Sequence, residues 1–204
     1  MATRPRQRSP LALVILSFVF EGPAHAYRMH ELIKQRGKDS VVNVAQRNSV
    51  YQTIAQLEAT GLIRVRETQQ DGGRPERVIY EITPAGRTTF HAWLEGMLIE
   101  PRREFGEFPA ALATVMALSP ATVSAALEKR LHSLEQQLAE SESSTRSARE
   151  AGLPRLFTLD DEYKQAIAKA EIDWLQRVLS ELASGELSWN DAWLRKIARQ
   201  FEAK

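Results

Sequence analysis

Amide and hydroxyl side chains gather between residues 47 and 61 at spacings that suit a helix. Val50, Ile54 and Leu57 fall on one side of such a helix. The other side is small, polar and nearly uncharged, and it carries Asn48, Ser49, Tyr51 and Gln52. Such groups can donate to and accept from the edges of nucleic-acid bases. The pattern predicts a base-reading helix, although each residue alone also fits an ordinary solvated face.

Positive charge lies where contacts to a nucleic-acid backbone would need it. Arg47 begins the predicted helix, and Arg74 and Arg77 lie beside a predicted turn, so all three are candidates for phosphate contacts. The whole chain has a net charge of only +1, but residues 1–47 hold 8 basic and 3 acidic side chains, and residues 101–204 hold 14 and 16. A basic front and a faintly acidic back indicate two separate roles.

Three helices are predicted to position this surface. Ser9 and Pro10 are typical of the start of a first helix, which Glu21-Gly22-Pro23 would end. A second helix is expected over residues 24–36, and a short extended piece over 41–44. The third helix runs from about Arg47 and ends at Gly61, a residue common just after a helix.

The hydrophobic period changes from 3.6 to 2 after the third helix. Residues 63–66 alternate, Asp71-Gly72-Gly73 signals a turn, and residues 77–82 form the return strand. Thr83-Pro84 then opens a fourth helix over residues 85–98. Three helices followed by a two-stranded hairpin are typical of a winged helix-turn-helix, which places its third helix in the major groove.

The N-terminus also imitates a secretory signal peptide. Three arginines precede the apolar run 11–20, and Ala24-His25-Ala26 resembles a cleavage site. Ten apolar residues are too few to span a bilayer, which needs about 20. Cleavage would remove the packing partner of the second helix, and a chain without cysteine gives no support for export. We therefore expect a buried first helix in a cytoplasmic protein, with an exported protein as the alternative.

Three stretches resemble the PadR family of bacterial transcription regulators. They are EGPAHAY (21–27), SVYQTIAQLEATGLI (49–63) and RVIYEITPAG (77–86), within a match over roughly residues 9–98. The resemblance implies that Tyr27 and Tyr51 contact phosphates, that the start of the third helix enters the major groove, and that Arg74 and Arg77 serve the wing. Ala26 replaces the usual glycine before Tyr27. Gln46-Arg47-Asn48 replaces the usual small opening of the recognition helix, so base preference does not transfer.

The C-terminal half predicts long amphipathic helices. Residues 99–110 look like a hinge that leads into an apolar stretch, 108–118, and Ser119-Pro120 begins a long helix. Its stripe comprises Val123, Leu127, Leu131, Leu134 and Leu138. The polar stretch 141–152 is expected to fray or turn. Thr158 and Asp161 resemble a capping box that starts the next helix. That helix carries a stripe of Tyr163, Ile167, Ala170, Trp174, Val178 and Leu182, and it ends at Gly185.

A last helix is expected over residues 188–203, with Trp189, Trp193, Ile197 and Phe201. Helices this amphipathic need an apolar partner. The simplest partner is a second copy of the chain, and the resemblance implies a dimerisation domain here too. The predicted dimerisation residues are Leu127, Leu131, Leu134, Leu138, Trp174 and Val178. An intramolecular bundle is the alternative.

No sequence motif of an enzyme is present. The chain lacks cysteine, a phosphate loop, a nucleophile elbow and an HExxH motif, and its four histidines are poorly spaced for a metal. We expect no catalytic residue, metal or cofactor. Four tryptophans could line an aromatic effector pocket, although packing in a core or interface is the simpler role.

The sequence thus predicts a mainly α protein with two domains. Residues 1–98 would form a winged helix-turn-helix DNA-binding domain, and residues 99–204 a helical dimerisation and effector-response domain. The expected function is sequence-specific transcriptional regulation by a homodimeric repressor that a small-molecule effector releases from double-stranded operator DNA. The alternatives are an activator of the same fold and a winged-helix protein-interaction module that binds no DNA.

Overall fold

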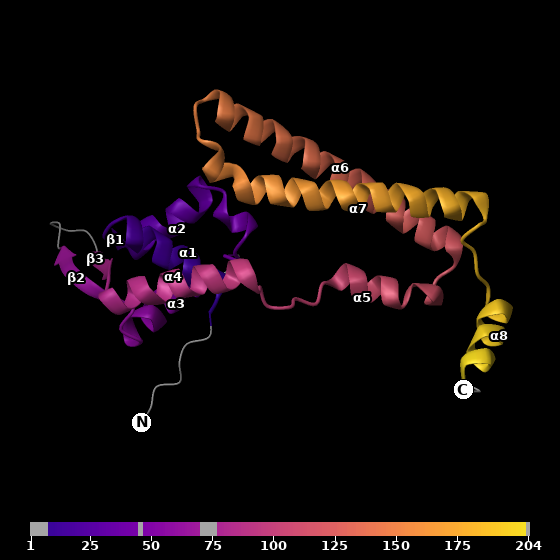
Figure 1. Ribbon diagram of the computed structural model, residues 1–204, viewed down its shortest axis with the longest axis horizontal. Helices are drawn as coiled ribbons and strands as arrows, with labels where there is room; N and C mark the ends of the chain where they lie inside the picture. The colour runs from indigo at the N-terminus through magenta and orange to yellow at the C-terminus, as the bar shows by residue number, and fades with distance from the viewer. Residues whose placement is uncertain (1–7, 45–46, 70–76, 203–204) are drawn as a thin grey trace. The chain divides into compact units, whose positions relative to one another are not determined.

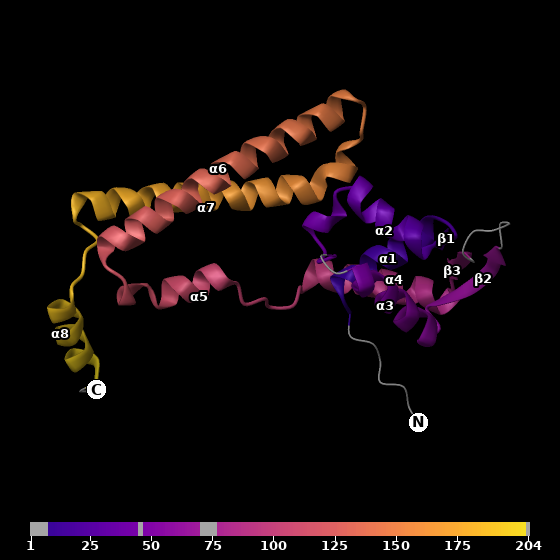
Figure 2. The ribbon, with the colours of Figure 1, turned by 180° about the vertical axis from the view of Figure 1, so that it is seen from behind.

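The computed structural model describes residues 8–44, 47–69 and 77–202. The chain is mainly helical and divides into two compact units between Glu104 and Phe105, so the predicted fold class is confirmed. Figures 1 and 2 show the elements of each unit. The first unit contains α1 (Pro10–Glu21), β1 (Ala24–His25), α2 (Ala26–Gln35), a short 3-10 helix (Lys38–Ser40), α3 (Arg47–Ala59), β2 (Ile63–Gln69), β3 (Arg77–Ile82) and α4 (Pro84–Ile99).

The structure confirms the helix starts predicted at Ser9 and Thr83 and the helix end predicted at Gly61. The Ser9 hydroxyl accepts a hydrogen bond from the Ala12 amide, and the Thr83 hydroxyl accepts one from the Gly86 amide at 3.0 Å, so both residues cap helices. Gly61 has φ +70° after α3, and the next amide, Leu62 N, donates to the Leu57 carbonyl at 2.9 Å. Glycine suits this left-handed position because it has no Cβ.

The sheet has three strands, in the order β1-β3-β2, where the sequence predicted two. The additional strand β1 pairs Ala24 with Tyr80 and His25 with Ile79. The predicted second helix therefore begins at Ala26 and not at Ala24. Two residues are too few to display a strand's alternating pattern, so β1 arises from pairing with β3 and not from a local signal.

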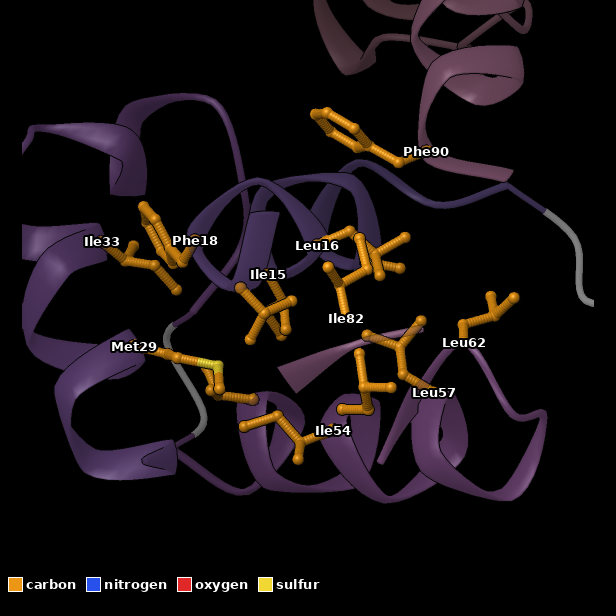
Figure 3. Close-up of a cluster of buried hydrophobic side chains, with 14 of the residues drawn as sticks. Ile15, Leu16, Phe18, Met29, Ile33, Ile54, Leu57, Leu62, Ile82 and Phe90 are labelled. Atoms are coloured by element: carbon orange, nitrogen blue, oxygen red, sulfur yellow. The ribbon is translucent and has the colours of Figure 1, made fainter. Parts of the chain in front are cut away.

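One apolar core holds the first unit together. Helix α1 contributes Ile15, Leu16 and Phe18, as the buried-helix prediction expected. Figure 3 shows these side chains meeting Met29 and Ile33 of α2 and other side chains from α3, the sheet and α4. Burial of such side chains is the dominant stabilising contribution to folding. No helix among the described residues is long and apolar enough to cross a membrane.

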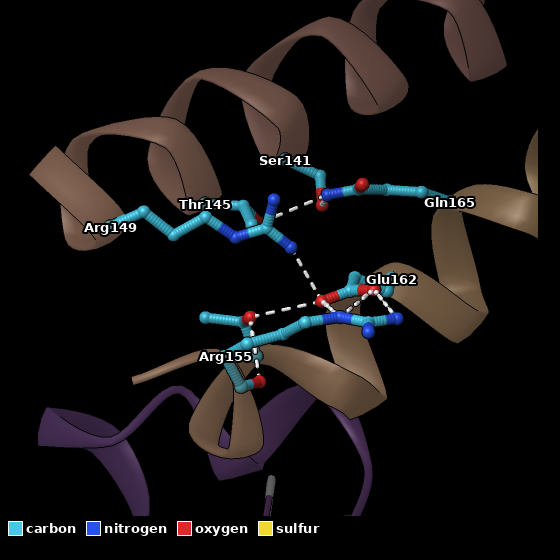
Figure 4. Close-up of polar contacts among 7 residues, drawn as sticks. Ser141, Thr145, Arg149, Arg155, Glu162 and Gln165 are labelled. Carbon is cyan, nitrogen blue, oxygen red and sulfur yellow. Dashed lines mark hydrogen bonds and ion pairs between the residues drawn. The ribbon is translucent and has the colours of Figure 1, made fainter. Parts of the chain in front are cut away.

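The second unit is built around two long antiparallel helices. Its elements are α5 (Glu107–Ala113), a 3-10 helix (Val115–Ala117), α6 (Pro120–Glu150), a second 3-10 helix (Arg155–Thr158), α7 (Leu159–Ser184) and α8 (Asp191–Glu202). The turn expected within residues 141–152 lies at the end of this stretch, because α6 continues to Glu150 and the chain turns at Ala151 and Gly152. The Gln165 side-chain amide of α7 donates to the Ser141 and Thr145 hydroxyls of α6, both at 3.0 Å (Figure 4). The polar stretch is thus a polar helix–helix contact.

Of the last two predicted helix starts, the one at Thr158 has the predicted position without the predicted cap, and the one at residue 188 lies three residues too early. The Thr158 hydroxyl donates to the Arg155 carbonyl at 3.1 Å and caps no backbone amide, so the predicted capping box is absent. Helix α8 begins at Asp191, after Asn190 accepts a hydrogen bond from the Trp193 amide at 2.9 Å. The predicted end of α7 is confirmed, since Gly185 adopts φ +78° directly after Ser184.

The apolar half of the α6–α7 contact includes the second half of the predicted α7 stripe, together with Leu175 and Leu179. Val123 and Leu127 of α6 are buried together with Leu175 of α7. Partly buried side chains around them are Phe108, Val115, Leu131, Leu134, Trp174, Val178, Leu179, Leu182 and Trp189. Tyr163 and Ile167, from the predicted stripe, are exposed instead. The predicted stripe therefore lies in the core of the unit only toward the C-terminal end of α7.

Candidate nucleic-acid interface

Helix α3 separates apolar and polar side chains onto two sides. Val50, Ile54 and Leu57 are buried in the core of the first unit, and Figure 3 shows Ile54 and Leu57 pointing into it. The side chains of Asn48, Tyr51 and Gln52 are exposed, and that of Ser49 is half-buried. The core thus fixes which side of α3 faces outward.

The outward side can form specific hydrogen bonds. Asn48 and Gln52 are one helical turn apart, so their amides lie on the same exposed side. Each amide carries both donors and acceptors, which is what paired contacts to a base edge require. Tyr51 adds an exposed phenol beside them. The predicted residues of α3 are therefore together on one surface.

Tyr27 lies at the start of α2. It is exposed, and its ring stacks against that of His25, with ring centroids 6.3 Å apart. His25 Nδ1 accepts a hydrogen bond from the Arg28 amide at 3.0 Å and caps the helix. The N-terminus of a helix carries partial positive charge and favours anions. Tyr27 is thus placed where a phosphate contact is electrostatically favourable.

The wing, which is the hairpin of β2 and β3, contains a basic residue that the sequence pattern did not single out. A β-bulge interrupts β2, because Val65 pairs with Tyr80 and Glu67 pairs with Ile79, which leaves Arg66 between them without a partner in the sheet. Bulges twist a strand locally and redirect a side chain. Arg66 is exposed, and among the described residues it forms no ion pair or hydrogen bond. No local sequence signal announces the bulge.

Two other arginines of this unit, Arg64 and Arg36, each form an ion pair with a glutamate of the same unit. Arg64 contacts Glu81, its direct neighbour across the sheet, at 2.6 Å. Arg36 contacts the Glu21 carboxylate at 2.6 and 2.8 Å, and these hydrogen bonds raise the pKa of Arg36. Such pairs hold α1 to α2 and β2 to β3. Arg66 therefore differs from both as a cation available to a partner.

Of three predicted contact residues, the structure describes two in part and one not at all. Arg47 is the first residue of α3 and Arg77 the first of β3, and the structure describes their backbone placement alone. Arg74 lies outside the described residues.

Tyr80 of β3 is half-buried. Burial of its phenol, together with the negative charge of Glu58, raises the pKa of Tyr80, so the phenol stays neutral.

The predicted dimerisation residues lie in the α6–α7 pair. Leu127, Leu131 and Leu134 of α6 belong to its core, as do Trp174 and Val178 of α7, and Leu138 is half-buried farther along. Each stripe thus has an apolar partner within the chain, as the intramolecular alternative expected. A dimer through this unit remains a prediction.

The second unit also holds an apolar pocket of about 380 Å³ between α5 and α6. Its lining includes Phe108, Leu112, Val115, Val123 and Leu127. Arg130 lies at its wall, with the guanidinium carbon 3.7 Å from the Phe108 ring centroid, and it pairs with Glu171. Among the residues described, no group of three His, Asp or Glu side chains could hold a metal ion.

Comparison with known proteins gives a family match for part of the first unit and a fold for most of the chain. Residues 15–92 match the model of the "Transcriptional regulator PadR-like family". A comparison with curated protein sequences found no match. Bacillus subtilis PadR in complex with operator DNA superposes with a TM-score of 0.71 at 20% identity, over 85% of this chain and 99% of that chain.

Two further solved structures share this fold. Bacillus subtilis PadR in complex with p-coumaric acid has a TM-score of 0.70 at 18% identity, covering 86% of this chain and 99% of that one. The Vibrio cholerae virulence activator AphA has a TM-score of 0.64 at 21% identity, covering 85% and 98%. Residues 15–92 thus match the PadR-like family of transcriptional regulators, and the winged-helix unit followed by long helices has the fold of the solved PadR structures.

Proposed function

We propose that this chain is a sequence-specific DNA-binding regulator that acts as a homodimeric repressor. The observation that carries the proposal is the division of α3, whose apolar side is buried and whose outward side presents Asn48, Tyr51 and Gln52. A helix that enters the major groove needs this combination of a rigid base and exposed amides. The role places the protein in the cytoplasm with its DNA, without enzymatic activity.

The proposed mechanism separates sequence reading from backbone contact. Asn48, Ser49 and Gln52 would hydrogen-bond base edges in the major groove. The backbone contacts would come from Tyr27, Arg47, Tyr51, Arg66, Arg74 and Arg77. Phosphate contacts orient a protein on the duplex and carry no sequence information. The protein would therefore bind any duplex weakly and its operator strongly.

A homodimer would place two reading helices on two half-sites, about one helical turn apart. The helical unit is the candidate dimerisation unit, and the six predicted residues in α6 and α7 would serve it by holding the helix pair together. Light scattering tests the assembly, because a dimer has twice the 23.0 kDa mass of the chain. A monomer at micromolar concentration would contradict it.

An effector would act by binding one conformation of the dimer better than another. The pocket beside Phe108 supports a small apolar ligand, because Arg130 in its wall is already paired with Glu171 and offers no free cation for a carboxylate. Bacillus subtilis PadR in complex with p-coumaric acid shows that a protein of this fold binds an aromatic acid. The ligand of this chain would contain an aromatic ring like that of p-coumaric acid, but it would not need a carboxylic acid group.

Two alternatives to a repressor are tested by the same experiment. The Vibrio cholerae protein of this fold is an activator, so occupancy of DNA by this chain could raise transcription. A winged helix can also serve as a protein-interaction module. Footprinting on the DNA upstream of the chain's own gene, together with a reporter gene placed under the control of that DNA, distinguishes the repressor, the activator and the interaction module. A footprint with repression supports the proposal, a footprint with activation supports the activator, and the absence of any DNA binding supports the interaction module.

A further inference from the structure

The pocket of the second unit lies between two walls that different elements form. One wall is α5 with the 3-10 helix that follows it, and the other is the first part of α6. Apart from Thr114 and Arg130, every side chain of the lining is apolar. A volume of about 380 Å³ suits a small organic molecule. A ligand in this pocket would therefore contact α5 and α6 together.

Helix α5 has little stability of its own. It has 7 residues, none of them is buried, and Gly106 provides no side-chain cap. Phe108 anchors it, because the ring lies under the Arg130 guanidinium and meets the Trp174 ring edge-on, with ring centroids 6.2 Å apart. A ligand that fills the space beside Phe108 would add apolar contacts between α5 and α6 and would fasten α5 in place.

The residues that line the pocket offer no unpaired charge to a ligand. Two nitrogen atoms of Arg130 lie 2.5 and 2.6 Å from the Glu171 carboxylate, so the one charged side chain of the lining already has its counterion. A carboxylate that entered the pocket would lose water without gaining a free cation, and burial of an unpaired charge is costly. The pocket therefore favours a neutral ligand.

Thr114 can accept a hydrogen bond from such a ligand. Its hydroxyl donates to the Ala110 and Ala111 carbonyls at 3.3 and 3.1 Å. A hydroxyl has one donor and two acceptor lone pairs, so these internal bonds use the donor and leave the oxygen able to accept. At the end of the same wall, the Leu118 carbonyl already accepts from the Trp189 indole N–H at 2.8 Å. A ligand with a hydrogen-bond donor therefore matches Thr114.

We propose that the pocket binds a neutral aromatic molecule with one hydrogen-bond donor, such as a phenol or an indole, and that this ligand fastens α5 to α6. The inference rests on the effector response of the proposed function and assigns its ligand class and the element that responds. Residues 100–106 join α4 to α5 without a helix or strand (Figure 1). A fastened α5 leaves only this stretch as free chain between the two units, whereas a released α5 would lengthen it.

Calorimetric titration of the full-length protein with three probes tests the ligand class. The phenol p-cresol should bind about fivefold or more tightly than toluene, which lacks the donor, and about tenfold or more tightly than 4-hydroxybenzoate, which adds a carboxylate. Thr114→Val keeps the shape and removes the acceptor, so it should bind p-cresol and toluene equally, with toluene binding unchanged. An unaltered preference of this variant for p-cresol, or tighter binding of 4-hydroxybenzoate by the wild type, would overturn the proposal.

Ala126→Leu tests the location, because Ala126 lines the pocket and a larger side chain would fill it. This variant should lose p-cresol binding, whereas Ala125→Leu, at the exposed neighbouring position outside the lining, should bind p-cresol as the wild type does. Equal binding by the two variants would place the ligand elsewhere and overturn the proposal.

Hydrogen exchange tests the response of α5. Saturating p-cresol should slow amide exchange in residues 107–113 and leave that of α1 unchanged. Binding of p-cresol without slower exchange in α5 would overturn the fastening. Operator binding, measured without any probe, keeps the two proposals separate. A protein that binds its operator but not p-cresol contradicts this inference alone, and one that binds p-cresol but no DNA contradicts the proposed function.

Discussion

Gly86 lies so close to Leu62 that a Cβ atom on Gly86 would be 2.0 Å from the Leu62 carbonyl oxygen. The contact joins the first turn of α4 to the residue between α3 and β2. Thr83 strengthens the same junction, since its amide donates to the Leu62 carbonyl at 3.1 Å and its hydroxyl donates to the Gly61 carbonyl at 2.7 Å. This junction fixes α3 relative to the wing, and it explains the glycine of the RVIYEITPAG stretch.

Gly86→Ala should destabilise the winged-helix unit by at least about 2 kcal/mol, because the added methyl group meets backbone that cannot move without displacing the wing. Urea unfolding measures the change. Gly22→Ala is the matched control, since a Cβ there meets nothing within 4 Å, and its stability should stay near that of the wild type. Equal stability of the two variants would show that the junction is looser than described.

Asn48→Ala and Gln52→Ala should each weaken operator binding by about 1–3 kcal/mol, while binding to unrelated duplex DNA stays nearly constant. The reason is that each exposed amide would lose contacts to a base edge and not to phosphate. Fluorescence anisotropy on both duplexes measures the ratio. Gln176→Ala removes an exposed glutamine of α7 and should change neither affinity. A uniform loss on both duplexes would contradict base reading by α3.

Arg66→Ala should weaken binding to all duplexes alike and lower the salt dependence by about one counterion. Arg74→Ala is expected to behave in the same way. Arg64→Ala is the comparison within the wing, because Arg64 is already paired with Glu81 and should contribute less to DNA binding. Titrations at several salt concentrations give the slopes. If Arg64→Ala changes the slope and Arg66→Ala does not, the role assigned to the bulge is wrong.

Glu162 should make the stability of the helical unit depend on pH in the acidic range. Hydrogen bonds from Arg155 lower the pKa of Glu162, and Arg149 adds to the effect (Figure 4). The folded chain then binds this proton less readily than the unfolded chain. The stabilisation is complete above the ordinary glutamate pKa of about 4.3 and is lost as pH falls through the lowered folded pKa.

Glu162→Gln removes that pH-dependent stabilisation. The difference in urea midpoint between the wild type and Glu162→Gln should therefore shrink as pH falls below the ordinary glutamate range. Glu140→Gln, at an exposed glutamate of α6, should give a small difference that does not vary with pH. A Glu162→Gln difference that stays constant with pH would contradict the pairing.

The winged-helix unit was largely predictable because its signals are local. Ser9, Gly61 and Thr83 mark helix ends by their own chemistry, and the spacing of Val50, Ile54 and Leu57 determines which side of α3 is buried. That spacing also leaves Asn48, Tyr51 and Gln52 outward, so the candidate site follows from the helix pattern. These features need no knowledge of distant contacts.

The remaining features depend on contacts between distant residues. Strand β1 exists because Ala24 pairs with Tyr80, and α6 continues through its polar end because Gln165 bonds to its hydroxyls. The stripe on α7 continues along the whole helix, so its pattern alone cannot tell that Trp174 packs in the core while Tyr163 stays exposed. The bulge at Arg66 likewise follows from strand pairing and not from local sequence.

Selection of binding sites from random duplex DNA by the full-length protein tests the central proposal most directly. The account predicts enrichment of one motif with two inverted half-sites about one helical turn apart. It also predicts that an Asn48→Ala and Gln52→Ala double variant, folded as judged by circular dichroism, fails to enrich that motif. Recovery of no motif by the wild-type protein, or of the same motif by the double variant, would contradict sequence reading by α3.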